Sequence, residues 1–303
     1  MENEKIINEI RRLKKEKNAI ILAHNYQMPE VQDIADFVGD SLELSKKAAN
    51  TDGDIIVFCG VHFMAESAKI LSPDKKVLLP VKDAGCPMAD MIDSEKLREF
   101  KALNPDVPVV CYVNSSAEVK AHSDVCCTSS NALKIVNSLE SKKVIFVPDK
   151  NLGSYIADKI IDKEIILWNG FCITHHRVLD KEIDEIRIRK PGVKILVHPE
   201  CNKEVADKAD FIGSTSEIIN YVRESNDKEL IIGTEMGILH KLRKENPNKK
   251  LYLLSPSLVC YNMKKTSIKD VYNALDKEEN EIFIDEIIME KAYKSLDRML
   301  KLS

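Results

Sequence analysis

The chain has 303 residues and a formal net charge of −4, and 44% of its residues are hydrophobic while 31% are charged. This composition is typical of a globular protein, and the length suits one to three domains. The balance is slightly acidic and no basic stripe carries interleaved aromatic residues, which argues against nucleic acid as a partner.

The sequence indicates neither a membrane segment nor export. No apolar run approaches the roughly 18 residues that are needed to cross a bilayer. The N-terminal stretch is charged and amphipathic, and it lacks the apolar segment of a signal peptide. We therefore expect a cytoplasmic protein that binds no membrane, in which the eight cysteines are buried thiols or metal ligands rather than disulfides.

A helix is predicted over residues 3–17, where Ile6, Ile7, Ile10 and Leu13 share one face. The chain then repeats one pattern three times. An apolar strand ends in a polar triplet, and an Asp-containing turn and a pair of small residues follow. A helix, a second strand, another helix and a third strand then complete the unit. A last helix that packs onto the body is predicted over residues 281–302.

The repeat has a nearly constant period. Equivalent positions separated by 86 or 88 residues are the first residues of the triplets (His24, Tyr112, His198), three hydroxyl residues (Ser41, Ser129, Thr215) and three cysteines (Cys86, Cys172, Cys260). Similar units that recur at one period indicate a threefold arrangement around a shared centre.

Short strands that alternate with helices predict an α/β fold with parallel sheets. We expect three similar small α/β sandwich domains related by pseudo-threefold symmetry around a central active site. A single large doubly wound sheet is disfavoured, because the pattern restarts in each repeat. The first repeat with the N-terminal helix is assigned to residues 1–104, the second to 105–190, and the third with the C-terminal helix to 191–303.

The third predicted strand of each unit ends in Cys86, Cys172 or Cys260. A single cysteine at a strand end is usually a small buried hydrophobe, but three equivalent thiols can meet on one axis. Three sulfur ligands suit an iron–sulfur cluster with one open iron, or a zinc ion with an open fourth position. His175 and His176 follow Cys172, so that one of this pair can face the metal.

The polar triplets end strands, where functional groups of parallel sheets gather. Residues two apart on a strand point to the same side, so His198 and Glu200 form a candidate acid–base pair. A surface turn paired with nearby lysines is the alternative. The same two positions hold His24 and Tyr26 in the first unit, and Tyr112 and Asn114 in the second. The hydroxyl residues are predicted to cap helices, whose N-termini can also bind a phosphate or carboxylate.

Together, these motifs resemble the quinolinate synthase family of bacterial NAD biosynthesis. The resemblance covers essentially the whole chain, through the segments AHNYQ, GDS, GCPMADM, YVNSSAE, TSSNA, HPEC, GSTSE and GTEMG. It implies a [4Fe-4S] cluster held by Cys86, Cys172 and Cys260, with one open iron. Leu254 and Ser257 stand where some members carry a CxxCxxC run, so a redox switch based on that run is absent.

The resemblance also implies the reaction, which condenses iminoaspartate with dihydroxyacetone phosphate to quinolinate with loss of phosphate and two waters. The open iron would act as a Lewis acid. Glu200 is the expected general base, assisted by Tyr26 and His198, and an aspartate oxidase or dehydrogenase would supply iminoaspartate. Substrate binding is assigned to His24, Ser41, Tyr112, Val113, Asn114, Ser129, His198, Pro199, Glu200 and Thr215.

Three other interpretations stay open. Another [4Fe-4S]-dependent hydro-lyase on the same scaffold would be distinguished by a panel of substrates. A zinc-stabilised repeat scaffold for a protein partner predicts a colourless protein. An electron carrier is disfavoured, because carriers usually complete four-cysteine ligation and only three symmetric thiols occur here.

Overall fold

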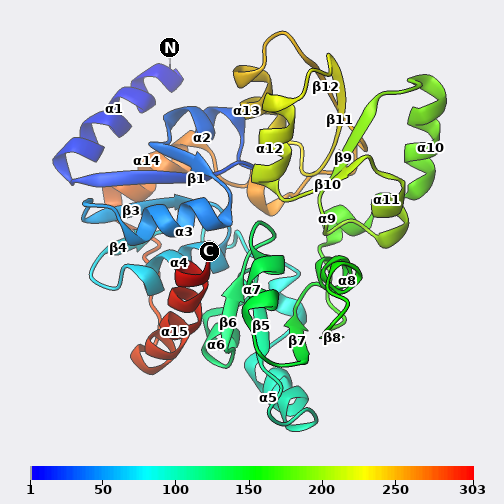
Figure 1. Cartoon of the computed structure of the whole chain (residues 1–303). Coiled ribbons are helices and arrows are strands. Elements are labelled where there is room, and N and C mark those ends of the chain that lie inside the picture. Colours follow the sequence, from blue (N-terminus) through cyan, green and yellow to red (C-terminus); the bar gives the residue numbers. More distant parts are fainter. Residues whose placement is uncertain (1) are drawn as a thin grey trace.

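Three parallel sheets of four strands lie around a common centre in the computed structural model (Figure 1). The structure describes residues 2–303. In every sheet the first strand in sequence lies between the second and the third, and the fourth strand forms the far edge. This common order confirms the predicted α/β architecture of three similar units. The boundaries at residues 104 and 190 stay predictions.

The strands are short and all pair in parallel. The first sheet contains β1 (Ala19–His24), β2 (Phe37–Gly39), β3 (Ile55–Cys59) and β4 (Lys76–Leu78). The second contains β5 (Val109–Tyr112), β6 (Val125–Cys127), β7 (Lys143–Val147) and β8 (Glu164–Leu167). The third contains β9 (Lys194–Val197), β10 (Phe211–Ile212), β11 (Glu229–Gly233) and β12 (Lys250–Leu253).

A helix precedes each of these strands. The first unit has α1 (Glu2–Glu16), α2 (Pro29–Ile34), α3 (Ser41–Ala49) and α4 (His62–Leu71). The second has α5 (Ser94–Ala102), α6 (Ala117–Ala121), α7 (Ala132–Ser138) and α8 (Lys150–Lys159). The third has α10 (Asp180–Arg189), α11 (Lys203–Lys208), α12 (Thr215–Glu224) and α13 (Ile238–Glu245). Outside this alternation lie α9 (Ile173–His176), α14 (Ile268–Lys277), α15 (Glu286–Leu302) and the 3₁₀ turns Ala89–Met91 and Asn262–Lys264.

Two predictions about the strands were wrong. Each unit contains four strands instead of three, because β2, β6 and β10 form between the turn and the following helix. These edge strands have only two or three residues, which is too short to show an alternating pattern. The last strand of each unit also ends earlier than predicted, at Leu78, Leu167 and Leu253, so the three equivalent cysteines lie in the loops that follow.

The aspartate of the repeated turn fastens the edge strand to its neighbour. In each unit its side chain accepts a hydrogen bond from a backbone N–H of the first strand. The three bonds are Ile21 N to Asp36 (2.7 Å), Val109 N to Asp124 (2.7 Å) and Ile195 N to Asp210 (2.9 Å). The turn therefore recurs because it satisfies the same backbone group three times.

The predicted caps were displaced by one or more residues. Asp40 is the N-cap of α3 and Ser214 is the N-cap of α12, and each forms a capping box with the glutamate three residues later. Ser41 and Thr215 are therefore the first helical residues, while Ser129 lies in the turn before α7. Since the preceding residue already caps the helix, these hydroxyl groups are left available for other partners.

The helix predicted at the N-terminus is confirmed as α1, whose Ile10 and Leu13 are buried. Helix α14 packs against α1, and α15 packs against α6 and α4, so the last helices cover the first two units (Figure 1). Among residues 2–303, no helix combines the length and apolar character that a membrane crossing requires.

Candidate active site

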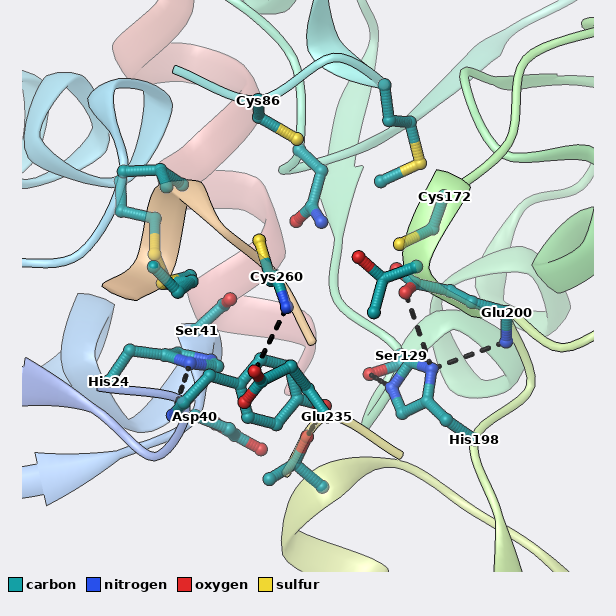
Figure 2. A pocket seen from close by; sticks show the side chains of 18 of the residues that line it. His24, Asp40, Ser41, Cys86, Ser129, Cys172, His198, Glu200, Glu235 and Cys260 are labelled. Carbon is teal, nitrogen blue, oxygen red and sulfur yellow. Dashed lines mark hydrogen bonds and ion pairs between the residues drawn. The ribbon is translucent and has the colours of Figure 1, made fainter. Parts of the chain in front are cut away.

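A single cavity lies where the three units meet (Figure 2). It brings together most of the residues that the repeat singled out: His24, Tyr26, Ser41, Cys86, Tyr112, Asn114, Ser129, Cys172, His198, Glu200, Thr215 and Cys260. Val113 and Pro199, the middle residues of two triplets, are not among the lining residues. The first and third positions of the triplets thus face the centre, and the middle position does not.

Two histidines have the same local geometry. The backbone N–H of Tyr26 donates to Nδ1 of His24 at 3.2 Å, and that of Glu200 donates to Nδ1 of His198 at 3.3 Å. When Nδ1 accepts, the neutral ring carries its hydrogen on Nε2. In His198 this Nε2 lies 3.2 Å from Oγ of Ser129.

Both imidazoles are buried, and this burial controls their charge. Burial lowers the pKa of His24 to about 4 and that of His198 to about 3. At neutral pH both rings are therefore uncharged donors that face the cavity. A surface turn paired with lysines, the alternative raised for His198 and Glu200, is wrong, because each is only 3% exposed.

The Glu200 carboxylate is held by hydrogen bonds from two sides. Burial opposes its ionisation, but the positive potential of His198 and His175 and hydrogen bonds from His175 and Tyr112 outweigh it and lower the pKa of Glu200 to about 2. Tyr112 donates to Oε1 at 2.7 Å, and Nδ1 of His175 lies 2.7 Å from Oε2. His198 is neutral at neutral pH, so there the hydrogen bonds keep Glu200 ionised.

A chain of hydrogen bonds links Glu200 to the first unit. From His175, Nε2 lies 2.9 Å from the Thr234 hydroxyl, which lies 2.7 Å from the Tyr26 hydroxyl. The Tyr26 hydroxyl is also 2.8 Å from Oγ1 of Thr215. In the His175 tautomer that donates to Glu200 through Nδ1, Nε2 accepts from Thr234, which in turn accepts from Tyr26. Burial raises the pKa of Tyr26 well above its usual value, so this phenol stays protonated.

The three cysteines come from different units and point into the same space (Figure 2). Burial raises the pKa of all three thiols, that of Cys86 to about 12. Protonated thiols in a closed site are converted to thiolates by a soft metal centre, which replaces the protons. The lining contains three cysteines and no fourth, so the donor set fits a cluster that is held by three thiolates.

Cys172, His175 and Glu200 also lie close together. Their ligand atoms are all within 4.8 Å of one another, which is compatible with a single metal ion. The His175–Glu200 hydrogen bond and a 3.2 Å contact between His175 Nδ1 and Cys172 Sγ account for this proximity without an ion. Of the two adjacent histidines, His175 lines the cavity, whereas the ring of His176 packs against Phe171.

Several polar residues of the cavity were not predicted, among them Asp40, Thr128, Ser130, Thr174 and Glu235. Asp40 precedes Ser41 in the GDS segment. Its role as the helix cap can be found in the sequence, because a glutamate follows it by three residues as in a capping box. Its Oδ2 accepts hydrogen bonds from Ser130 and Ser216, both at 2.7 Å, and thereby joins all three units.

One polar atom of the lining has no hydrogen-bond partner among residues 2–303. Oδ1 of Asn114 is buried and accepts no hydrogen bond from the described residues. A buried acceptor without a donor is costly, and ordered water or a ligand usually satisfies it. This oxygen is therefore suited to a ligand that brings its own donor into the cavity.

Comparisons with known proteins agree with the site. A family model described as "Quinolinate synthetase A protein" matches residues 8–301. A quinolinate synthase of Alkaliphilus metalliredigens is 66% identical over 302 residues, which cover 100% of both chains. A quinolinate synthase of Clostridium kluyveri is 58% identical over 297 residues, covering 98% of both chains, and one of Caldicellulosiruptor saccharolyticus is 56% identical over 303 residues, covering 100% of both.

Proposed function

The chain belongs to the quinolinate synthetase A protein family, and on this premise we propose that it is a quinolinate synthase of NAD biosynthesis. The proposed reaction joins iminoaspartate and dihydroxyacetone phosphate and releases quinolinate, one phosphate and two waters. We further propose that it works in the cytoplasm, where an aspartate oxidase or dehydrogenase supplies iminoaspartate. The observation that supports the proposal most directly is the meeting of three thiols with an ionised Glu200 in one buried cavity.

The proposed cofactor is a [4Fe-4S] cluster, and Cys86, Cys172 and Cys260 are the residues that would hold it. With three protein ligands, such a cluster keeps one iron available as a Lewis acid for a hydroxyl or carboxylate oxygen. Our proposal rests on the donor set: three soft sulfur ligands, no fourth cysteine in the lining, and burial that excludes competing water.

Substrate binding is assigned to neutral donors. His24 and His198 present Nε2–H groups without a positive charge, and Ser41 and Thr215 add hydroxyl groups at the first residues of α3 and α12, which the preceding residues cap. The dicarboxylate and the phosphate both need such donors. The unpaired oxygen of Asn114 would accept from a substrate hydroxyl or from the imine nitrogen.

Proton transfer is assigned to Glu200 and the tyrosines beside it. A general base must be ionised, and the lowered pKa of Glu200 meets this requirement at neutral pH. A carboxylate of such low pKa is a weak base on its own. Hydrogen bonds from Tyr112 and His175 weaken as Glu200 takes a proton, so their loss accompanies proton uptake. Tyr26 stays protonated through its raised pKa and can donate to a departing hydroxyl.

The test begins with anaerobic purification, followed by iron and sulfide assays, a visible spectrum and an assay of quinolinate formation from the two substrates. About four irons per chain together with quinolinate would support the proposal. A colourless protein without product would overturn it. A coloured protein that acts on other hydroxy acids of a substrate panel, and makes no quinolinate, would instead support a different hydro-lyase.

Glu200→Gln should keep the cluster, because Glu200 is not one of the three sulfur ligands, and should lower turnover by at least about 100-fold. Glu204→Gln is the matched control, since Glu204 is exposed in α11 and does not line the cavity. Near-normal turnover of the Glu200 variant would refute its role as the base.

A further inference from the structure

Two buried carboxylates occupy the same place in the second and third units. Asp149 follows the end of β7 by two residues, and Glu235 follows the end of β11 by two residues. The two positions are 86 residues apart, the separation of Ser129 from Thr215 in the same two units, and both side chains are completely buried. Burying a carboxyl group at one position of two units is costly unless the group has strong partners.

Each carboxylate binds the backbone of a cysteine. Oδ2 of Asp149 accepts from the N–H of Cys172 at 3.0 Å, and Oε1 of Glu235 accepts from the N–H of Cys260 at 3.1 Å. The second oxygen binds near its own strand. Oδ1 of Asp149 accepts from Leu152 N at 2.8 Å, and Oε2 of Glu235 accepts from Gly237 N at 2.7 Å. Each carboxylate therefore joins the start of the following helix, α8 or α13, to the loop that carries the cysteine.

The first unit lacks this bridge. Val61 stands two residues after the end of β3, at the position equivalent to Asp149, and cannot accept a hydrogen bond through its side chain. The loop of Cys86 keeps a backbone bond to its own unit, from His62 N to the carbonyl oxygen of Ala84 at 2.8 Å, and gains a bond from another unit. Nδ2 of Asn262 donates to the carbonyl oxygen of Gly85 at 2.9 Å. Because Asn262 follows Cys260 by two residues, this bond connects the Cys86 loop to the loop that Glu235 holds.

We propose that Asp149 and Glu235 are positioning residues for the metal centre, which hold the Cys172 and Cys260 loops at the separation that the cluster requires. This inference rests on the cofactor of the proposed function. A carboxylate suits the task because both of its oxygens accept, and each faces an N–H group. An amide of the same shape offers one acceptor and turns its NH₂ group toward the other N–H, so one of the two bonds is lost.

The experiment compares Asp149→Asn and Glu235→Gln with the wild-type protein, all purified anaerobically with the cluster in place. The rate at which an iron chelator bleaches the visible absorbance measures how firmly the centre is held. Visible circular dichroism reports the arrangement of its sulfur ligands. We expect both variants to bleach about 10-fold faster or more, with an altered dichroism, because each loses one of the two buried hydrogen bonds that hold the cysteine loop.

Asp285→Asn is the matched control, because Asp285 is also a carboxylate that accepts two backbone N–H groups, at the start of α15. Its hydrogen bonds go to Ile287 and Ile288 and to no cysteine loop, so its variant should bleach at the wild-type rate. Thermal unfolding of the cluster-free proteins shows whether a variant has lost its fold rather than the position of its loop.

If a variant does not fold, amide hydrogen exchange of the cluster-free wild type decides the question. The Cys172 and Cys260 amides should exchange at least 10-fold more slowly than the Cys86 amide, which has no such carboxylate. Equal exchange at the three cysteines would overturn the inference and leave the proposed function intact. Folded variants with the wild-type bleaching rate and the wild-type circular dichroism would do the same. A wild-type protein without iron would instead overturn the proposed cofactor.

Discussion

Acidification is expected to destabilise the fold through the buried ring of His24. This side chain is 5% exposed, and burial lowers its pKa from 6.5 to about 4. Between these two pH values the unfolded chain binds a proton that the folded chain does not, so stability falls as the pH falls from 6.5 to 4. At about 1.4 kcal/mol for each pH unit, the gap between the two pKa values is worth about 3 kcal/mol.

The assay measures the free energy of unfolding by urea for the cluster-free protein, from pH 7 down to pH 4. His24→Gln removes the titrating ring and keeps a polar side chain, so the variant should lose about 3 kcal/mol less than the wild type over this range. The comparison uses the slope with pH and not the absolute stability, which the substitution also changes. Glu200 is present in both proteins, so its own titration cancels.

The matched control is His122→Gln. Burial also lowers the pKa of His122, but this side chain is only partly buried, so its replacement should change the slope much less. If the wild-type and His24→Gln curves run parallel from pH 7 to pH 4, the histidine is not held neutral by burial. The reasoning for neutral donors in the cavity would then be wrong.

Two further predictions concern the sulfur ligands and the junction of the units. The Cys172→Ala variant should fold but lose the visible absorbance of the cluster and the activity. Cys201 lies outside the cavity, so Cys201→Ala should keep both. A fully coloured Cys172 variant would contradict the ligand assignment. Asp40→Ala removes a helix cap and two hydrogen bonds between units, and should lower the free energy of unfolding by about 2–4 kcal/mol. Asp285→Ala removes a helix cap alone and should lower the free energy of unfolding by about 1 kcal/mol. If urea titrations gave the same loss for both variants, the hydrogen bonds of Asp40 between units would add no stability.

The periodic part of this architecture could be predicted from the sequence. Positions such as Cys86, Cys172 and Cys260 recur because three similar units place them alike, so their spacing reveals a shared centre without any structure. The direction of the triplets was also predictable for the first and third residues. Their middle residues, Val113 and Pro199, look equivalent in the sequence but do not line the cavity, since the chain turns as each strand ends.

Contacts between units could not be predicted in this way. Tyr26 reaches Thr234 across a separation of 208 residues, and no local pattern specifies which hydroxyl it meets. The edge strand β10 was missed for a different reason. It has two residues and is stabilised by pairing with β9 rather than by its own composition.

The three cysteines belong to three different units, and this arrangement affects the stability of the fold. A centre that binds all three cross-links the chain across intervals of 86 and 88 residues. In the chain-entropy description, closing a loop of such length costs the denatured state about 4–5 kcal/mol of conformational freedom. The cofactor would then stabilise the tertiary structure as a cross-link does, and its oxidative loss would lower the free energy of unfolding while the units stay packed through their shared apolar core.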